Sequence, residues 1–413
     1  MIPALAVGST ARLEGLGVIP DFVEDYGNMF TYPVSITRYP AVVVGEIGDF
    51  NAPVTWDRGF GATMGVGEDN MYGVFGIMLR ENSFFSPIPY MVGAEASQFD
   101  MLWGMNFGNA SFGLRFDRAS SELEIVEALV LSPLALWDMM DEPTLNDLNT
   151  MGLGFSAGFN VRETDMVEAT FEYRTLDFMV DDIGGDWKVE DKGEPSYGVT
   201  ARGFFSMADG KTLVPMVAYA KYDGSWEIQS ADPDDEDSAD ETITLMRAGL
   251  GYKVDVGSWF MLGLGFSQWK AEGEYDYAMA TPDPDWIESY ELTTSTMPFF
   301  FGCLETPVRN WLTVRFGAVK RLVKEELVVT SVGGDKIEVT TKNGVIPDEI
   351  RDGFDLNLPC FEEPFVFSMG VGFKFGDLDI DATLNQFYPF TGMYWLSGVD
   401  EVPFGRISAT YHY

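Results

Sequence analysis

The last ten residues, FGRISATYHY (Phe404–Tyr413), alternate strictly between two kinds of side chain. Every second side chain is apolar or aromatic: Ile407, Ala409, Tyr411 and Tyr413. The residues between them are polar, and this period of two is typical of a β-strand with one wet and one dry face. A strand at the end of a chain leaves an unpaired edge unless it closes a barrel by pairing with the first strand. The C-terminal stretch therefore favours a closed β-barrel.

The same strand character recurs in sixteen segments along the chain. Many of them have one apolar face opposite a face of Gly, Ser and charged residues, as in NASFGLRFD (109–117) and FVFSMGVGFKF (365–375). The predicted strands lie at 40–49, 58–66, 71–80, 98–107, 109–117, 151–161, 166–174, 196–207, 211–222, 243–254, 257–269, 292–303, 310–322, 364–376, 377–386 and 404–413.

Short and long connections alternate between these segments. Short ones include GEDN (Gly67–Asn70), VRETD (Val161–Asp165) and DVG (Asp255–Gly257), whereas long ones such as 223–242 and 270–291 carry runs of acids. Tight turns at one end of antiparallel hairpins and long loops at the other are typical of bacterial outer-membrane barrels. We therefore predict an all-β fold, a transmembrane antiparallel barrel of sixteen strands with fourteen as the alternative. Its short turns are expected in the periplasm and its acidic loops outside the cell.

Charge and composition limit the partners. The chain has 65 acidic and 26 basic residues, a formal net charge of -39. This balance excludes nucleic acid, since binding there depends on Lys and Arg that neutralise phosphates. The expected partners are outer-membrane lipid and lipopolysaccharide, with divalent cations at the acidic loops and a homo-oligomer as further expectations. One His and two Cys give no cofactor site, and Cys303 and Cys360 are expected to be unbridged because they belong to opposite rims.

One stretch matches the sequence pattern of a catalytic motif but not its structural context. GFSAG (Gly154–Gly158) fits the GxSxG pattern, which requires a turn between a strand and a helix. Here it lies in the middle of an alternating strand, with Ser156 on the polar face. We predict that the chain is not an enzyme.

Both ends of the chain resemble known outer-membrane families. ISATYHY, with Tyr411 and Tyr413, resembles the C-terminal assembly signal of outer-membrane proteins. GLG (Gly15–Gly17) and the acids Asp21, Glu24 and Asp25 resemble the N-terminal plug of the long-chain fatty-acid transporters, although MFTY separates Asn28 from Pro33 where that family has Asn-Pro-Ala. This resemblance implies a plug at 1–39, a barrel at 40–413 and transport of hydrophobic substrates. An extended periplasmic tail is the alternative for residues 1–39, and the transporter family has fourteen strands.

Sixteen strands and the long insertion 118–150 resemble general diffusion porins instead. In porins the equivalent loop folds into the lumen, and here it would form a constriction with the acids Glu122, Glu124, Glu127, Asp138 and Asp141. The alternation predicts the following pore-lining residues: Arg115, Glu168, Glu172, Arg174, Arg202, Arg247, Lys253, Arg315, Lys374, Asp379, Asp381 and Arg406. Inner-face positions such as Gly113 and Ser368 are expected to face open water.

Three functions follow from these resemblances. The main prediction is a porin-like outer-membrane channel for passive diffusion of small solutes. The second is a barrel for hydrophobic substrates, in which apolar residues of the 118–150 insertion would form a groove. The third is a structural or docking barrel without an open pore, with its acidic loops as the binding surface. Independently of these three, internal salt bridges are the alternative role for the inner charges.

Overall fold

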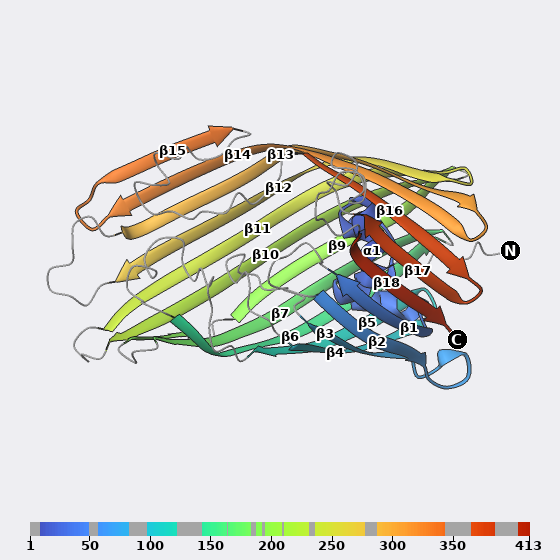
Figure 1. Ribbon diagram of the computed structural model, residues 1–413, viewed down its shortest axis with the longest axis horizontal. Helices are drawn as coiled ribbons and strands as arrows, with labels where there is room; N and C mark the ends of the chain where they lie inside the picture. Colours follow the sequence, from blue (N-terminus) through green and yellow to red (C-terminus); the bar gives the residue numbers. More distant parts are fainter. Residues whose placement is uncertain are drawn as a thin grey trace, which may run out of the picture.

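The computed structural model describes residues 9–48, 57–81, 97–121, 143–162, 164–182, 187–191, 195–208, 210–230, 236–276, 287–342, 365–384 and 404–413. All strands in these ranges belong to one antiparallel sheet (Figure 1). The first strand, β1 (Ala41–Gly48), pairs on one side with β2 (Asp57–Gly65) and on the other with the last strand, β18 (Phe404–His412). The sheet is therefore a closed barrel.

The other strands follow in chain order around the barrel. Their bounds are β3 (Val74–Glu81), β4 (Ser97–Phe107), β5 (Ala110–Ser121), β6 (Pro143–Arg162), β7 (Asp165–Asp182), β8 (Trp187–Asp191), β9 (Pro195–Ala208), β10 (Lys211–Ser230), β11 (Glu236–Asp255), β12 (Trp259–Asp276), β13 (Ile287–Arg309), β14 (Leu312–Ser331), β15 (Lys336–Lys342), β16 (Phe365–Phe375) and β17 (Leu378–Leu384). Strands β8 and β9 share one position between β7 and β10, and β15 and β16 both pair with β14. The described strands thus occupy sixteen positions, which confirms the first predicted count.

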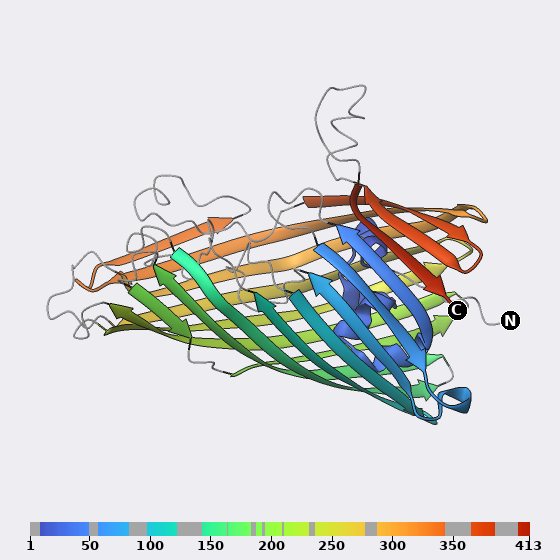
Figure 2. The same cartoon turned by 60° about the horizontal axis from the view of Figure 1, so that its bottom comes forward.

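Each predicted segment coincides with a strand, but several strands are longer than predicted. β13 has 23 residues and β6, β10, β11 and β14 have 20 each. About ten residues suffice to cross the bilayer, so these strands extend well beyond it. The barrel consequently has one tall side and one short side, as Figures 1 and 2 show. Strands β8 and β15 lie in the regions predicted as loops.

Large apolar side chains cover the outer surface of the barrel. Phe171 is 47% exposed, Leu153 49% and Leu264 52%, and each stands at an outward position of the register. Around the periplasmic ends, Trp311 and Phe373 stack with ring centroids 6.2 Å apart, which is typical of an aromatic girdle. Such a surface is stable only against acyl chains, and a closed barrel leaves no unpaired backbone in the bilayer. The chain is a β-barrel of the outer membrane of Gram-negative bacteria.

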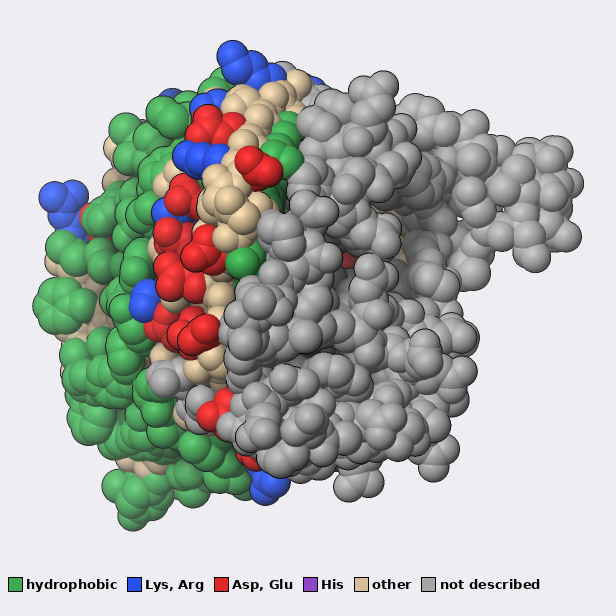
Figure 3. Space-filling model, turned by 90° about the vertical axis from the view of Figure 1, so that its left-hand side faces the viewer, with side chains coloured by type: hydrophobic (Ala, Val, Ile, Leu, Met, Phe, Trp, Pro, Cys, Tyr) green, Lys and Arg blue, Asp and Glu red, His purple; other side chains and the backbone are tan. Residues whose placement is uncertain are grey.

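Polarity reverses where the tall strands leave this apolar band. On β12 the outward residues are Phe260, Leu262, Leu264 and Phe266 near the periplasmic end, and then Gln268, Lys270, Glu272 and Glu274 farther along. Figure 3 shows the corresponding acidic and basic side chains in a column beside the hydrophobic surface. The reversal marks the upper limit of the membrane, because polar side chains face outward only where water replaces lipid.

The short turns have the predicted positions. The β11–β12 turn contains Gly257 with φ 94°, and the β16–β17 turn contains Gly376 with φ 66°. Both lie in the left-handed region, where a residue without a Cβ is favoured. Among the described residues, no helix has the length and hydrophobicity needed to cross a membrane.

Residues 9–39 lie inside the barrel rather than below it (Figures 1 and 2). This segment, called the plug below, contains the helix α1 (Thr10–Leu16) and the short 3-10 helices η1 (Pro20–Phe22), η2 (Tyr26–Phe30) and η3 (Pro33–Arg38). Ser9 caps α1 by accepting a hydrogen bond from the Arg12 amide, and Gly17, with φ 54°, ends it.

Candidate functional site: the plugged lumen

The first contact between plug and barrel is a buried network of charges at α1. Arg12 donates to Glu305 on β13 at 2.8 Å and to Asp25 in the plug at 2.9 Å. Arg315 on β14 donates to the same Glu305 at 2.6 Å and to Asp381 on β17 at 2.7 Å. Side chains of all five residues are at most 8% exposed. Each charge therefore has an opposite partner, without which its burial would be strongly unfavourable.

A second network holds η3 against β7 and β9. Arg38 of the plug contacts Glu168 at 2.5 Å and Glu24 at 3.0 Å. Arg202 of β9 contacts Glu168 at 2.9 Å and lies 4.0 Å from the centroid of the Tyr32 ring. Its guanidinium also donates to the backbone carbonyl of Val23 at 3.1 Å. The plug is thus bound to opposite sides of the barrel by separate charge clusters.

Glu46 on β1 provides a third attachment. Its carboxylate accepts hydrogen bonds from the amide and hydroxyl of Thr10, each at 2.9 Å, from the Tyr26 hydroxyl at 2.7 Å and from Ser408 at 3.0 Å. One carboxylate therefore joins the start of α1, the start of η2 and the seam where β1 meets β18.

Glycines on the inner face let the plug backbone approach the barrel closely. A Cβ at Gly370 would lie 3.0 Å from the Cα of Gly15, and one at Gly17 would lie 2.7 Å from the Ser368 hydroxyl oxygen. A Cβ at Gly113 would clash with the backbone of Val34. The expectation that Gly113 and Ser368 face open water is wrong, because both positions contact the plug.

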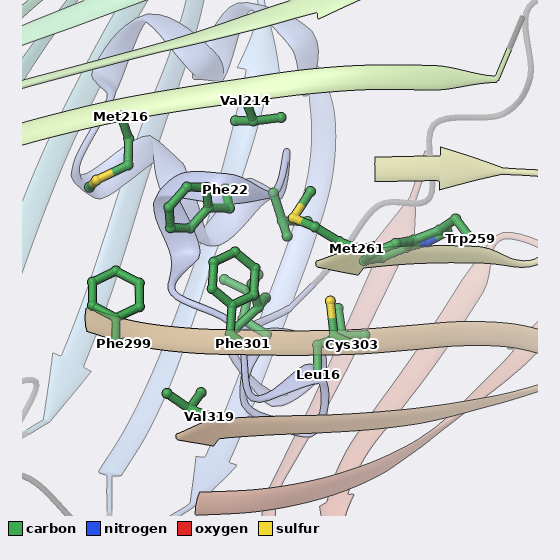
Figure 4. Close-up of a cluster of buried hydrophobic side chains, with 13 residues drawn as sticks. Leu16, Phe22, Val214, Met216, Trp259, Met261, Phe299, Phe301, Cys303 and Val319 are labelled. Carbon is green, nitrogen blue, oxygen red and sulfur yellow. The ribbon is translucent and has the colours of Figure 1, made fainter. Parts of the chain in front are cut away.

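Apolar side chains fill the remaining contact, between the plug and β10–β14 (Figure 4). Leu16 and Phe22 of the plug pack in one buried cluster with Val214, Met261 and Phe301 of the barrel. Cys303 belongs to this cluster, so it faces the lumen in the interior of β13 instead of ending the strand at the rim as predicted; its thiol is free. Cys360 lies outside the described residues.

The predicted pore-lining residues all stand at inward positions of the register. The structure pairs most of them with one another or with the plug: Arg115 with Asp100 and Glu172, Arg174 with Asp117, Arg202 with Glu168, Arg247 with Asp21, Arg315 with Asp381, Lys374 with Asp379, and Arg406 with Glu14. Lys253 lies 4.9 Å from the centroid of the Trp259 ring. This arrangement corresponds to the internal salt bridges weighed above, and a pore-lining role for these residues stays a prediction.

The predicted constriction residues Glu122, Glu124, Glu127, Asp138 and Asp141 lie outside the described residues. Sequence reasoning missed the barrel side of the plug contacts, chiefly Glu46 and Glu305. Both acids occupy inward positions of alternating strands, so the pattern that selected Glu168 could also have selected them. Their partners Thr10 and Arg12 could not be found in this way, because apolar and polar residues do not alternate regularly in the plug.

Above the plug, the inner face of the tall strands is apolar. The upper inner wall, as we call it, comprises Ile243, Ala271, Leu292, Val323, Leu327 and Val329, each at most 8% exposed. Ile243, Ala271, Leu292 and Leu327 are direct neighbours across β11, β12, β13 and β14. Between the rank of Leu292 and Leu327 and the plug lies a polar row that includes Arg247, Ser267 and Thr296, with Val323 of the wall beside Thr296.

Two acids interrupt the upper inner wall. Glu325, 9% exposed, stands between Val323 and Leu327 on the inner face of β14. Glu241, 5% exposed, lies on β11 beyond the apolar outer band and accepts a hydrogen bond from the Tyr290 hydroxyl. Burial raises the pKa of Glu241 from 4.5 to about 7, although the Tyr290 hydrogen bond opposes the shift. Near neutral pH, Glu241 therefore carries only a fraction of a charge.

The opposite surface of the barrel has an apolar groove of about 650 Å³. It is lined by outward side chains such as Met101, Trp103, Phe155 and Phe171. Since this groove lies within the apolar band, it faces acyl chains and not the lumen.

Comparison with known proteins gives likeness at the level of fold. No family model matches the chain, and no curated protein matches it. Among solved structures, a Pseudomonas aeruginosa FadL homologue is 11% identical with a TM-score of 0.43, covering 97% of each chain. The TodX deltaS2S3 mutant, a monoaromatic hydrocarbon channel, is 9% identical with a TM-score of 0.43, covering 98% of this chain and 99% of its own. The translocator domain of the autotransporter NalP from Neisseria meningitidis is 11% identical with a TM-score of 0.31, covering 77% and 87%.

Proposed function

We propose that this barrel is an outer-membrane channel for small hydrophobic molecules, closed in the described state by its plug. The observation that carries the proposal is the apolar upper inner wall. In a water-filled pore the inner face is polar, because each Å² of apolar surface left in water costs about 25 cal/mol. Here the strands rise out of the membrane and turn Leu292, Leu327 and Val329 inward while Lys270 and Glu272 face outward.

The closed lumen supports the same proposal. An aqueous path for ions or sugars along the plug would have to pass the buried Arg12–Glu305–Arg315 and Arg38–Glu168–Arg202 networks. Removing one partner of a buried pair typically costs about 3–5 kcal/mol. A hydrophobic solute forms no favourable interaction with these charges. It can pass instead through the apolar cluster around Phe22. The plugged lumen therefore favours the hydrophobic-substrate interpretation over porin-like diffusion.

The test uses one matched pair of variants on β14. Leu327 faces inward and is 2% exposed, whereas its neighbour Val328 faces outward and opposes Glu338 of β15. Leu327→Asn is expected to slow uptake of an uncharged single-ring hydrocarbon across an asymmetric membrane with a lipopolysaccharide outer leaflet, and Val328→Asn is expected to leave it unchanged. Equal rates for the wild-type protein and a membrane without the barrel would contradict the proposal.

A further inference from the structure

This inference rests on the proposed function and concerns the place where the solute passes the plug. Two sides of the plug are held by charge. α1 is bound through Arg12 and by close backbone contact at Gly370, and η3 is bound through Arg38 to Glu168. On the third side, facing β10–β13, the plug presents the apolar side chains of Val18, Phe22 and Val23.

Phe22 is the centre of the third side. Its side chain is fully buried, and its ring centroid lies 4.7 Å from that of Phe301 on β13 (Figure 4). Phe299, two residues earlier on the same strand, lies 6.4 Å from Phe301. These distances are within the range of ordinary aromatic packing, so the contact is stabilised by burial and by the interaction of the rings.

Glycines form the surface under these rings. A Cβ at Gly249 would lie 2.7 Å from the Phe22 ring, and one at Gly251 would lie 3.0 Å from it. On the neighbouring strand, a Cβ at Gly265 would lie 2.5 Å from the Phe299 ring, and one at Gly263 would clash with Phe301. Two adjacent strands thus leave room for three aromatic rings on the inner face. No larger residue fits at these four positions without moving a ring.

Among the described residues, fewer charged pairs join η1 to the barrel than join α1 to it. The buried Arg202 of β9 donates to the carbonyls of Asp21 at 3.3 Å and Val23 at 3.1 Å. Arg247 on β11 approaches the Asp21 carboxylate at 3.9 Å, and its side chain is 30% exposed. The corresponding Arg12–Glu305 contact is 2.8 Å with both side chains at most 8% exposed. Exposed or distant pairs contribute at most about 1 kcal/mol. Movement of η1 away from β10–β13 therefore breaks the two Arg202 hydrogen bonds and one weak ion pair, but none of the buried ion pairs that hold α1 and η3.

We propose that Phe22 is the gate of the channel and that the solute takes the place of its ring. A solute from the upper inner wall would pass the row of Arg247 and reach the glycine surface, where the vacated volume matches a single aromatic ring. An apolar cavity of about 150 Å³ stays dry and binds benzene, so the space that the Phe22 ring would leave among apolar side chains favours single-ring hydrocarbons. Larger or charged solutes do not match it.

The test compares two aromatic residues of the plug. Phe22→Ala opens the site over the glycines, whereas Phe30→Ala removes a ring of the same size that lies 4.0 Å from Arg80 on the other side of the lumen. Uptake of toluene is measured across the asymmetric membrane, and heat-modified gel mobility reports folding. We expect Phe22→Ala to accelerate uptake about tenfold, which corresponds to about 1.4 kcal/mol of barrier, and Phe30→Ala to leave it unchanged. Phe22→Leu, which keeps an apolar side chain, serves if Phe22→Ala does not fold.

Cys303 gives a second readout in the same cluster. In a Cys360→Ser background, labelling of Cys303 by uncharged N-phenylmaleimide should become faster with Phe22→Ala and slower when toluene is added, while a charged maleimide of similar size should stay slow. Toluene uptake by the wild type together with equal effects of Phe22→Ala and Phe30→Ala would overturn the gate and leave the proposed function standing. Absence of toluene uptake in the wild type and in both variants would overturn the proposed function itself.

Discussion

Arg12 is the plug residue whose loss should be most costly. Its side chain is 4% exposed and serves two buried carboxylates, Asp25 at 0% and Glu305 at 8%. In Arg12→Met, Asp25 would keep its hydrogen bond from the Gly27 amide, at 2.9 Å, but would lose its cationic partner. Glu305 would keep its ion pair with Arg315, at 2.6 Å. Breaking a buried pair costs about 3–5 kcal/mol, and we expect a loss of about 3 kcal/mol because Glu305 keeps Arg315 as a cationic partner.

The assay is urea unfolding of the barrel in phospholipid vesicles, with Lys374→Met as the control. Lys374 contacts Asp379 at 3.3 Å, but its side chain is 56% exposed, so its loss should cost about 0–1 kcal/mol. Lowering the pH from about 8 to about 5 should restore part of the stability of Arg12→Met, because protonation removes the unpaired charge of Asp25. Equal losses for Arg12→Met and Lys374→Met, with no effect of pH, would refute the reasoning.

Two further predictions concern the outer surface and the upper inner wall. Phe171→Arg, at a lipid-facing position that is 47% exposed, should lower the free energy of urea unfolding by about 2–4 kcal/mol. Val161→Arg, at the periplasmic rim, should lower it by about 0–1 kcal/mol. A similar loss of stability at both sites would contradict the assignment of Phe171 to the lipid-facing surface. Glu241 has a pKa of about 7 against an ordinary 4.5, so the folded barrel holds a proton that the unfolded chain releases between these values. Stability should therefore fall, by up to about 3 kcal/mol, as the pH rises from about 4.5 through about 7, and Glu241→Gln should remove this slope. An unchanged slope in that variant would show that another group is responsible.

The barrel could be predicted from the sequence because its signal is local and repeated. In FVFSMGVGFKF and NASFGLRFD, lipid on one side and polar groups on the other require opposite kinds of side chain at successive positions, so the face of Phe112 or Phe373 follows from two or three residues. The sixteen strands and their turns were found in this way. The tops of the tall strands were missed because the pattern reverses there: in β12, Ala271 turns inward and Glu272 outward, which ends the expected lipid-facing row.

The state of the lumen could not be predicted by the same means. An inward Arg is compatible with a wet pore and with a buried ion pair, and the choice depends on a partner far away in the chain. Arg315 pairs with Asp381 across strands, and Glu305 pairs with Arg12, 293 residues earlier. Gly113 likewise gives no local sign that Val34 lies against it. Such contacts follow from the fold of the plug, whose short helices have no repeating pattern.

The most direct test of the central claim is the ratio of two uptake rates through the wild-type barrel. A single-ring hydrocarbon and a polar solute of about the same size are followed across the same asymmetric membrane, with a membrane lacking the barrel as reference. A lumen closed to water but bordered by Phe22 and the upper inner wall should pass the hydrocarbon at least about tenfold faster than the polar solute, a preference of about 1.4 kcal/mol. Faster uptake of the polar solute, accompanied by ionic conductance, would contradict the account.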